Sequence, residues 1–381
     1  MGSIKYHACA LTFFAAASGA SAQSSVTLYG SIDEALAYYN NTGHASVLQL
    51  QNAAFQSSYW GLQGNEDLGG ELKAIFALES GFDVTSGQLQ NGGRLFGRKA
   101  YVGLASSGLG TVTLGRQYDP TVDLVQGITA DSYGPAFATP GDADNNDGTV
   151  WIDNAIKYAS PTYAGFQYEL MYALGGVAGS ISSGHTYSAA ALYNNGGLSL
   201  AAGYLFAKND GPNGAGSADL TQNNSVTPLF GSVGMVGSRQ IAQVAVQYVV
   251  GNLTANARYS NAQYKPYLNY GAFNRTQTFN IAGTSLGYQL TPAALLAIGY
   301  NYTKSSGDSS ATYHTVAATS SYGLSKRTTF YATAAYSHAS GTTFSADGAT
   351  LVPAGGTVGD LTSSSGTPNQ VALIIGIVHK F

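Results

Sequence analysis

Charged residues are scarce in this sequence. Asp, Glu, Lys and Arg make up 9% of its 381 residues, whereas an average soluble domain contains about a quarter. The 16 basic residues are outnumbered by 20 acidic ones, so the net charge is -4. Proteins that bind nucleic acid concentrate basic residues on one surface. The composition therefore predicts a protein that is not an ordinary soluble domain and that has no nucleic-acid partner.

Cysteine is nearly absent, since Cys9 is the only one. It lies in an N-terminal segment where a basic residue precedes the apolar residues 8–17, and the small residues Ala20-Ser21-Ala22 follow. This order is typical of a secretory signal peptide and its cleavage site. We predict a signal peptide over residues 1–22 and one domain without a thiol over residues 23–381. A disordered or membrane-anchoring N-terminus is the alternative.

Long hydrophobic runs are also missing. No stretch approaches the roughly 18 apolar residues of a membrane-spanning helix, so the sequence argues against a helical membrane protein. Glycine and tyrosine are abundant instead, with 49 and 27 residues. Glycine lets strands bend tightly, and tyrosine gathers where a barrel meets the membrane interfaces. These residues indicate an all-β protein that crosses a membrane as a closed barrel.

Segments of alternating apolar and polar residues recur along the chain. In one of them, Leu253, Ala255, Ala257 and Tyr259 would face lipid, while residues 254, 256, 258 and 260 would face a wet lumen. We predict sixteen antiparallel strands, an even number as in other single-chain bacterial barrels. They are expected near residues 26–39, 56–64, 71–82, 95–106, 111–117, 153–160, 166–174, 184–194, 198–206, 239–250, 253–259, 276–290, 296–302, 313–324, 330–338 and 371–381.

The last predicted strand runs to the terminal aromatic residue, Phe381. Residues 371, 373, 375, 377, 379 and 381 lie on one face of this strand, and the first four of them are aliphatic. Such a face avoids aggregation only if the backbone is paired on both sides and lipid covers the side chains. We expect the strand to close the barrel against the first one, and Phe381 to act as an assembly signal.

Short turns alternate with long connections between the predicted strands. The long connections are residues 118–152, 208–238 and 340–369, which exceed the length of a hairpin turn. We expect them outside the cell or folded into the lumen, with a plug or constriction among them.

Several segments carry a family resemblance. The stretch from Trp60-Gly-Leu-Gln-Gly-Asn-Glu-Asp-Leu-Gly-Gly to Phe82, the segments 95–104 and 110–118, and the His-Lys-Phe ending resemble the Gram-negative general trimeric porins, particularly the betaproteobacterial type. The resemblance covers the whole predicted mature chain. It implies a 16-stranded antiparallel transmembrane β-barrel that assembles as a homotrimer in the cell outer membrane, with an inward-folded constriction loop.

The resemblance also implies a set of pore residues. In this family, basic residues on the barrel wall face carboxylates on the inward loop, and the resulting field selects solutes together with pore size. Arg98 and Lys99 match the basic positions of the fourth strand, and Arg116 matches the one before the loop. Solvated lumen or rim charges without a selective role are the alternative for these three residues. Only one of Arg98 and Lys99 can point inward on a regular strand.

Three positions depart from the family pattern. Tyr59 and Trp151 stand where arginine is usual, and Ala136 stands where the loop usually has a glutamate. We therefore expect a constriction that is less charged and more aromatic than in the general porins, with girdle or loop packing as the alternative for the two rings. The candidate acidic partners that remain on the loop are Asp119, Asp123 and Asp131.

The acidic stretch Asp142-Ala-Asp-Asn-Asn-Asp-Gly148, with Asp153 at the twelfth place, loosely resembles a calcium-binding loop. Because glycine is absent from the sixth place and aspartate replaces the last glutamate, we interpret the stretch as a solvated acidic loop.

No histidine lies in a recognisable nucleophile or metal motif, so we predict no enzyme, cofactor or metal site. The predicted function is a water-filled channel for passive diffusion of small hydrophilic solutes and ions. Its expected partners are outer-membrane lipid, lipopolysaccharide and the barrel-assembly machinery. The alternatives are a channel that prefers sugar or aromatic solutes, and a barrel that serves as an adhesin or anchor.

Overall fold

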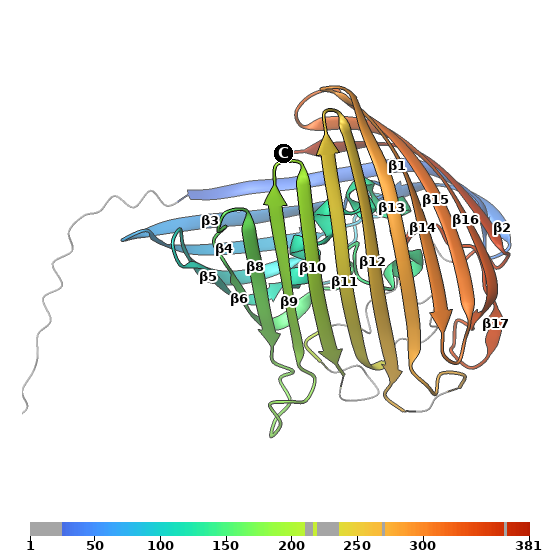
Figure 1. Ribbon diagram of the computed structural model, residues 1–381, viewed down its shortest axis with the longest axis horizontal. Coiled ribbons are helices and arrows are strands. Elements are labelled where there is room, and N and C mark those ends of the chain that lie inside the picture. Colours follow the sequence, from blue (N-terminus) through green and yellow to red (C-terminus); the bar gives the residue numbers. More distant parts are fainter. Residues whose placement is uncertain (1–24, 210–215, 219–235, 269–270, 362–363) are drawn as a thin grey trace, which may run out of the picture.

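The computed structural model describes residues 25–209, 216–218, 236–268, 271–361 and 364–381. The predicted signal peptide, residues 1–22 with Cys9, and most of the predicted loop 208–238 lie outside them. The described chain forms one antiparallel sheet that closes into a barrel (Figure 1). Its strands are β1 (Ser25–Thr42), β2 (Ala45–Asn52), β3 (Tyr59–Gly69), β4 (Leu72–Gly81), β5 (Lys99–Ser106), β6 (Gly110–Gln117), β7 (Ile152–Ala159), β8 (Phe166–Ala173), β9 (Thr186–Asn195), β10 (Leu198–Lys208), β11 (Val236–Val250), β12 (Leu253–Pro266), β13 (Gln277–Thr291), β14 (Ala294–Ser306), β15 (Ala311–Gly323), β16 (Thr328–Phe344), β17 (Leu351–Pro353) and β18 (Asn369–Lys380).

These 18 strands occupy sixteen positions around the barrel. Strands β2 and β3 pair with different halves of β1 and so share one position. Strand β17 pairs only with the end of β16 and adds no position to the wall. The predicted 16-stranded antiparallel barrel is therefore confirmed.

The two faces of each strand follow the predicted alternation. In β12, Ala257 and Tyr259 are exposed on the outer face, whereas Asn256, Arg258 and Ser260 are buried on the inner face. Large apolar side chains are exposed on most of the other described strands, which would promote aggregation in water and is suited to lipid. Exposed rings gather near both ends of the strands, as in the two aromatic belts of a membrane barrel. They include Tyr163, Phe166, Tyr248, Tyr288, Tyr322 and Phe330 toward the short turns, and Tyr172, Tyr187 and Tyr204 toward the long loops, whereas Tyr300 and Tyr336 lie in the middle of β14 and β16.

The barrel closes between its first and last strands. Strand β18 pairs with β1 from Ser31 opposite Lys380 to Tyr39 opposite Ala372. Phe381 extends this pairing, because its backbone N–H and C=O each form a hydrogen bond with Gly30, at 3.1 and 3.2 Å. The predicted closure of the barrel by the C-terminal strand is confirmed.

Two predicted strands begin three or more residues before the observed ones. Strand β5 begins at Lys99, so Leu95 to Arg98 lie outside it, and β3 begins at Tyr59, so residues 56–58 do not belong to the wall. Alternation therefore does not govern Arg98. The expectation that only one of Arg98 and Lys99 can point inward holds for a regular strand and does not apply here, since Arg98 precedes β5 and both side chains contact Glu79 on the inner face of β4. None of the helices in the described residues is long and apolar enough to cross a membrane.

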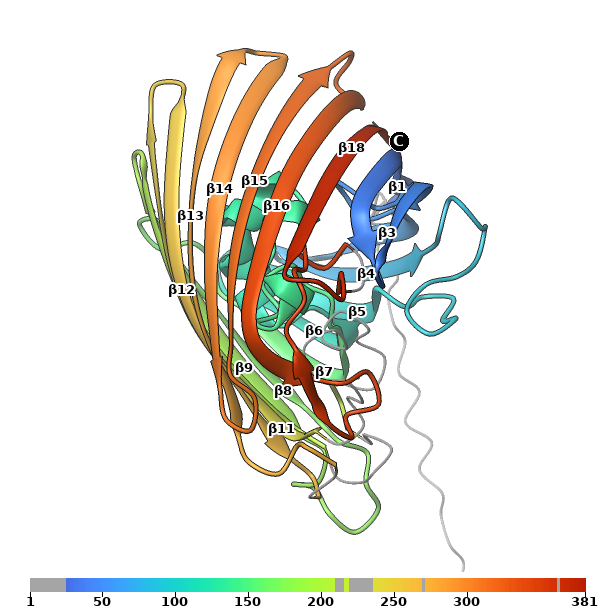
Figure 2. The same ribbon diagram turned by 90° about the vertical axis from the view of Figure 1, so that its right-hand side faces the viewer.

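The interior of the barrel is occupied by the connection between β6 and β7 (Figure 2). This connection, residues 118–151, is called the inner loop here. It contains one short α-helix and four 3-10 turns: α1 (Pro120–Leu124), η1 (Gln126–Ile128), η2 (Ala130–Tyr133), η3 (Pro135–Phe137) and η4 (Pro140–Asp142). Most of its side chains are buried, and those of η2 and η3 share an apolar cluster with the inner faces of β1, β14, β15, β16 and β18.

Candidate functional site

The sequence of the inner loop favours short turns over a long helix. Asp119 caps α1 by accepting a hydrogen bond from the backbone N–H of Thr121 at 2.8 Å, and Pro120 takes the first helical position. Gly134 has a φ of 112°, a conformation that favours glycine, and Pro135 begins the next turn. Gly134 ends one turn and the two prolines begin the next ones, so the chain changes direction repeatedly and the loop stays compact inside the barrel.

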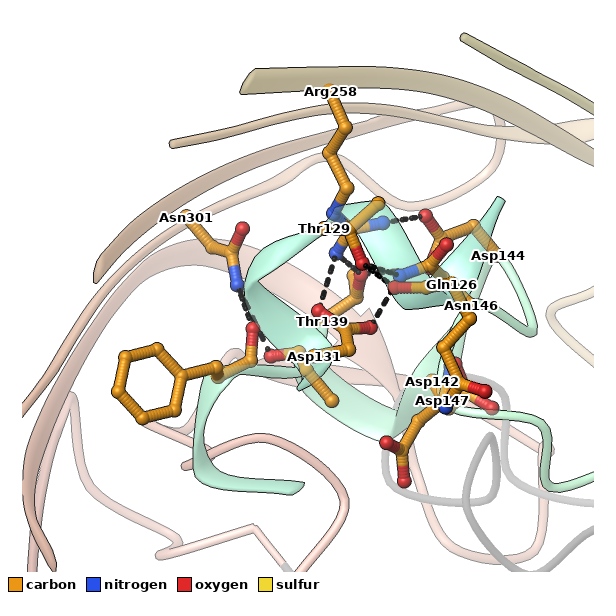
Figure 3. A network of polar contacts seen from close by, with 12 residues as sticks. Gln126, Thr129, Asp131, Thr139, Asp142, Asp144, Asn146, Asp147, Arg258 and Asn301 are labelled. Atoms are coloured by element: carbon orange, nitrogen blue, oxygen red, sulfur yellow. Dashed lines mark hydrogen bonds and ion pairs between the residues drawn. The ribbon is translucent and has the colours of Figure 1, made fainter. Parts of the chain in front are cut away.

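Arg258, on the inner face of β12, holds the inner loop to one wall (Figure 3). Its guanidinium pairs with the Asp144 carboxylate and donates a hydrogen bond to the hydroxyl of Thr139 at 2.8 Å. A carboxylate oxygen of Asp131 lies 3.6 Å away. Because the Arg258 side chain is only 2% exposed, removal of one partner would leave an uncompensated buried charge, which destabilises a protein strongly.

Further contacts attach the inner loop to the same wall. Asn301 of β14 donates hydrogen bonds to the carbonyls of Phe137 and Ala138. The Tyr264 hydroxyl of β12 donates to the carbonyl of Ala143 at 2.6 Å. Polar side chains of the wall thus satisfy backbone carbonyls that a buried loop would otherwise leave unpaired.

Glycine in this wall makes room for the loop. A Cβ on Gly287 of β13 would lie 2.1 Å from the hydroxyl oxygen of Tyr133, and one on Gly299 of β14 would lie 2.7 Å from the ring of Phe137. Real Cβ atoms do not approach other atoms so closely. The loop therefore packs directly on the backbone of β13 and β14 and leaves its free side toward the opposite wall.

A cavity of about 350 Å³ remains between the inner loop and that opposite wall. The wall and neighbouring segments contribute Phe55, Gln56, Ser57, Tyr59 and Arg98, and the loop contributes Tyr118, Gln126, Gly127, Asp131, Ser132, Gly134, Pro135 and Asp147. Of the eight predicted pore residues, Tyr59, Arg98 and Asp131 line this cavity. It combines one guanidinium, three aromatic rings and two carboxyl groups.

Arg98 is enclosed by one ring of the wall and by the two rings at the ends of the inner loop. Its guanidinium carbon lies 4.7 Å from the ring centre of Tyr59, 5.4 Å from that of Trp151 and 5.9 Å from that of Tyr118. Cation–π attraction at such distances is worth about 0.5 to 2 kcal/mol per contact. Glu79 lies 3.4 Å from the same guanidinium, so part of the positive charge is neutralised within the wall.

Lys99, Arg116 and Trp151 do not line the cavity. Lys99 pairs with Glu79 at 2.8 Å, and Arg116 pairs with Asp153 at 2.6 Å. Trp151 is buried and stacks on Tyr118 with ring centres 5.2 Å apart. The expectation that the tryptophan ring offers a face to solutes is therefore not met by this geometry, because Tyr118 covers it.

Two of the three predicted loop carboxylates serve other contacts. Asp119 caps α1 and accepts a hydrogen bond from Asn145 at 3.1 Å. Asp123 forms an ion pair with Lys157 of β7. Asp131 is the one that lines the cavity, and burial raises its pKa to about 6 although Arg258 favours the charged form.

The acidic stretch is buried from Asp142 to Asn146 and Asp153 is partly exposed, so the expectation of a solvated loop is wrong for the part from Asp142 to Asn146. Asp142 accepts hydrogen bonds from the backbone N–H groups of Asp147 and Thr149. Burial raises the pKa of Asp142 and Asp147 well above the usual range, and the nearby Asp360 carboxyl group adds to both shifts. In the described residues, no group of three or more His, Cys, Asp or Glu side chains is placed to hold a metal ion. These carboxyl groups hold the loop together.

Sequence reasoning missed several of these residues. Arg258 was placed on the inner face by alternation, but no local pattern links it to Asp144, which is 114 residues away in the sequence. Phe55 and Asp147 also lack a local motif. A buried arginine on a predicted inner face was the one available signal, because such a charge requires a partner.

Sequence comparison places the chain among porins. A model of the Gram-negative porin family matches residues 8–342. An outer membrane porin protein of Bordetella pertussis is 37% identical over 176 residues, 41% of this chain and 44% of the relative. Outer membrane porin protein 32 of Delftia acidovorans is 35% identical over 208 residues, 51% of this chain and 57% of the relative. The chain thus spans about half the length of these two relatives. The major outer membrane protein P.IB of Neisseria gonorrhoeae is 27% identical over 327 residues, 81% of this chain and 87% of the relative.

A solved structure supports the same fold. The anion-selective porin from Comamonas acidovorans superposes with a TM-score of 0.72 at 23% identity, over 94% of this chain and 100% of the other. The predicted family resemblance is confirmed, because the family model covers most of the sequence. The chain belongs to the Gram-negative porin family.

Proposed function

We propose that this protein forms a water-filled channel in the outer membrane through which small hydrophilic solutes and ions diffuse passively. The observation that carries the proposal is the inner loop, which is fixed to one wall by Arg258 and leaves a cavity of about 350 Å³ beside the other. A barrel of sixteen strands would otherwise enclose a wide aqueous channel. The cavity is the narrow section, and its side chains act by size, charge and stacking, without a cofactor or an enzymatic reaction.

The lining of the narrow section favours weak ion selectivity. Glu79 contacts both Arg98 and Lys99, and Asp153 neutralises Arg116. A wall whose basic side chains are paired with carboxylates produces a weaker electric field across the pore than a row of unpaired arginines. The rings of Phe55, Tyr59 and Tyr118 favour a preference for solutes with a flat face, such as sugars or aromatic compounds. A solute-preferring channel is the second candidate for this reason.

Single-channel recording in a planar lipid bilayer tests the proposal. Deletion of residues 132–146 in combination with Arg258→Met removes the core of the inner loop together with the charge that it neutralises. We expect a clear increase in conductance while the barrel keeps its heat-modifiable migration in gels. A conductance equal to that of the unaltered protein would place the narrow section elsewhere. An unaltered protein that does not conduct would support an adhesin or anchor instead.

The proposal includes assembly as a homotrimer that contacts lipid and lipopolysaccharide and is inserted by the barrel-assembly machinery. Phe381 supports this, because its backbone completes the pairing of β18 with β1 at Gly30. Deletion of Phe381 should lower the yield of detergent-resistant trimer in outer membranes. A normal yield would show that the terminal residue is not part of the assembly signal.

A further inference from the structure

The barrel wall is interrupted between β2 and β3. Strand β1 pairs with β2 as far as Glu34 opposite Asn52, and with β3 from Ser31 opposite Tyr59. Two residues of β1 therefore face six residues, 53–58, on the neighbouring strand. An ordinary β-bulge adds about one residue, so most of this segment leaves the wall. Residues 53–58 are called the wall bulge here.

Asp33 of β1 holds the wall bulge in place. One carboxylate oxygen accepts hydrogen bonds from the backbone N–H groups of Phe55 at 2.7 Å and Gln56 at 2.6 Å. The other accepts one from the Tyr331 hydroxyl at 2.7 Å. The backbone N–H of Asp33 donates to the Ser58 hydroxyl at 2.9 Å. One fully buried residue thus binds the middle and the end of the bulge and ties both to β16.

The wall bulge projects into the lumen and meets the inner loop. The ring of Phe55 stacks on that of Tyr331, with ring centres 4.7 Å apart and an angle of 24° between the planes. A Cβ on Gly134 would lie 3.2 Å from the carbonyl oxygen of Phe55. Phe55, Gln56 and Ser57 line the same cavity as Arg98 and Asp131. The cavity is therefore bounded by two inward segments, one on each side.

We infer that the wall bulge determines which solutes the narrow section prefers. Phe55 contacts solutes that have a flat ring, and Asp33 is the residue that positions Phe55. This inference rests on the proposed channel function. Phe55 contributes an apolar ring to a cavity that also contains Tyr59 and Tyr118. Aromatic faces stack on the flat or apolar faces of rings, so the class of solute favoured is a sugar or an aromatic ring over a branched or chain-like solute of equal size.

The first test compares Phe55→Ala with Phe330→Ala in single-channel recordings. Phe330 is exposed on the outer face of β16 and provides the matched control. Phenyl β-D-glucoside is the probe, and its block of the ion current gives a dissociation constant. We expect Phe55→Ala to raise this constant by roughly three- to tenfold and to raise conductance, while Phe330→Ala leaves both unchanged. Equal behaviour of the two variants would overturn the role of Phe55.

The second test concerns Asp33. Asp33→Asn weakens the acceptor for two backbone N–H groups, and Tyr331→Phe removes one donor while the ring stays in place. Asp308→Asn is the matched control, because Asp308 accepts hydrogen bonds from the backbone N–H groups of Asn274 and Arg275, both at 2.6 Å, in a segment that does not line the cavity. We expect Asp33→Asn to weaken block in the folded channel, Tyr331→Phe to do so to a smaller extent, and the control to have no effect.

A purely structural role of Asp33 would lower heat stability without changing block. The combination of Asp33→Asn with Phe55→Ala separates the two roles, because a residue that acts through Phe55 adds nothing to block once that ring is gone. Unchanged block in both Asp33→Asn and Tyr331→Phe, or an additive effect in the combined variant, would overturn the positioning role. If the unaltered protein does not conduct ions, the proposed channel function itself is wrong.

Discussion

Arg98 and Arg258 are the same residue type on two facing walls of the barrel, yet their surroundings differ in kind. Arg258 is enclosed by the inner loop, which supplies two carboxylates and a hydroxyl to it. Arg98 is surrounded by three rings and shares Glu79 with a lysine. The charge of Arg258 is neutralised by the inner loop and holds that loop in place, whereas the guanidinium of Arg98 lines the cavity.

The difference shows that the role of a buried arginine depends on the groups that contact its guanidinium. Where the inner loop brings carboxylates, the guanidinium becomes an attachment point for the chain. Where aromatic rings of the wall and of the two ends of the inner loop surround it, the guanidinium is mostly desolvated but lies beside the cavity and can act on a passing ion. Substitutions at Arg258, Arg98 and Tyr59 distinguish these two roles.

Arg258→Met should have the largest effect, because it leaves Asp131 and Asp144 buried without their cation. Breaking a buried pair in this way costs roughly 3 to 5 kcal/mol. We expect a lower temperature of unfolding and a larger, more fluctuating conductance as the inner loop detaches. Gel mobility after graded heating and single-channel recording measure the two effects.

Arg275→Met is the matched control. Arg275 pairs with Asp308 at 2.8 Å, but its side chain is 73% exposed, and exposed pairs contribute about 0 to 1 kcal/mol. If both variants lose the same stability, the pairing of Arg258 with the inner loop is not what fixes the loop.

Arg98→Gln should change ion selectivity more than stability, in contrast to Arg258→Met. Glu79 keeps Lys99 as a partner, so no buried carboxylate loses its only cation, and the loss of stability comes from three cation–π contacts of about 0.5 to 2 kcal/mol each. The reversal potential in asymmetric salt should shift toward cations, because the one guanidinium that lines the cavity is gone. A large loss of stability without a shift in reversal potential would give Arg98 the role assigned to Arg258.

Tyr59→Arg adds a second cation to the cavity and should shift the reversal potential toward anions. Tyr59→Ala, its matched control, removes the ring without adding charge and should mainly raise conductance and weaken solute block. Tyr59 lies 4.7 Å from the guanidinium carbon of Arg98, so the new charge would repel Arg98 and some stability should be lost. An unmoved reversal potential would mean that position 59 does not border the ion path.

A pH change should have the smallest effect. The pKa of Asp131 is raised from its ordinary value of 3.8 to about 6 by burial, so the folded state holds this proton more tightly than the unfolded chain. The stability linked to this group is present below about pH 4 and is lost as the pH rises through about 6. Ionisation over the same range adds a negative charge to the cavity.

Lowering the pH from 7 to 5 should therefore shift the reversal potential toward anions. Asp131→Asn should reduce this shift in reversal potential. The shift that remains in the variant comes from other carboxyl groups of the loop, such as Asp147, whose pKa is also raised by burial. An identical shift in Asp131→Asn and the unaltered protein would exclude Asp131 from the ion path.

The barrel could be predicted from the sequence because its strands carry a local signal. Alternation of period two separates Arg258 from Tyr259, and the sixteen predicted segments correspond to the sixteen positions of the wall. The predicted starts of two strands are wrong where the chain lies outside the wall, at residues 56–58 and at 95–98. Residue types there still suit a strand, and only tertiary contacts with Asp33 and Glu79 show that the chain has turned inward.

The site could be predicted only in part, because its geometry depends on contacts between distant residues. The family resemblance identified Arg98 and Asp131, which line the cavity. It could not show that Tyr118 covers Trp151 or that Asp119 is used as a helix cap. Such roles are decided by the path of the inner loop, which no local periodicity encodes.

The central claim is that the inner loop borders the ion path on the side of Arg98. The most direct test is Ser132→Cys, because Ser132 lies on the loop, is exposed and lines the cavity, and Cys9 is the only native cysteine. A positively charged methanethiosulfonate reagent should lower the single-channel conductance and shift the reversal potential toward anions, and a negatively charged one should lower conductance with the opposite shift. The same reagents on Ser325→Cys, in an exposed turn at the end of the barrel, should leave both unchanged. Rapid modification of Ser132→Cys with no change in current would contradict the account.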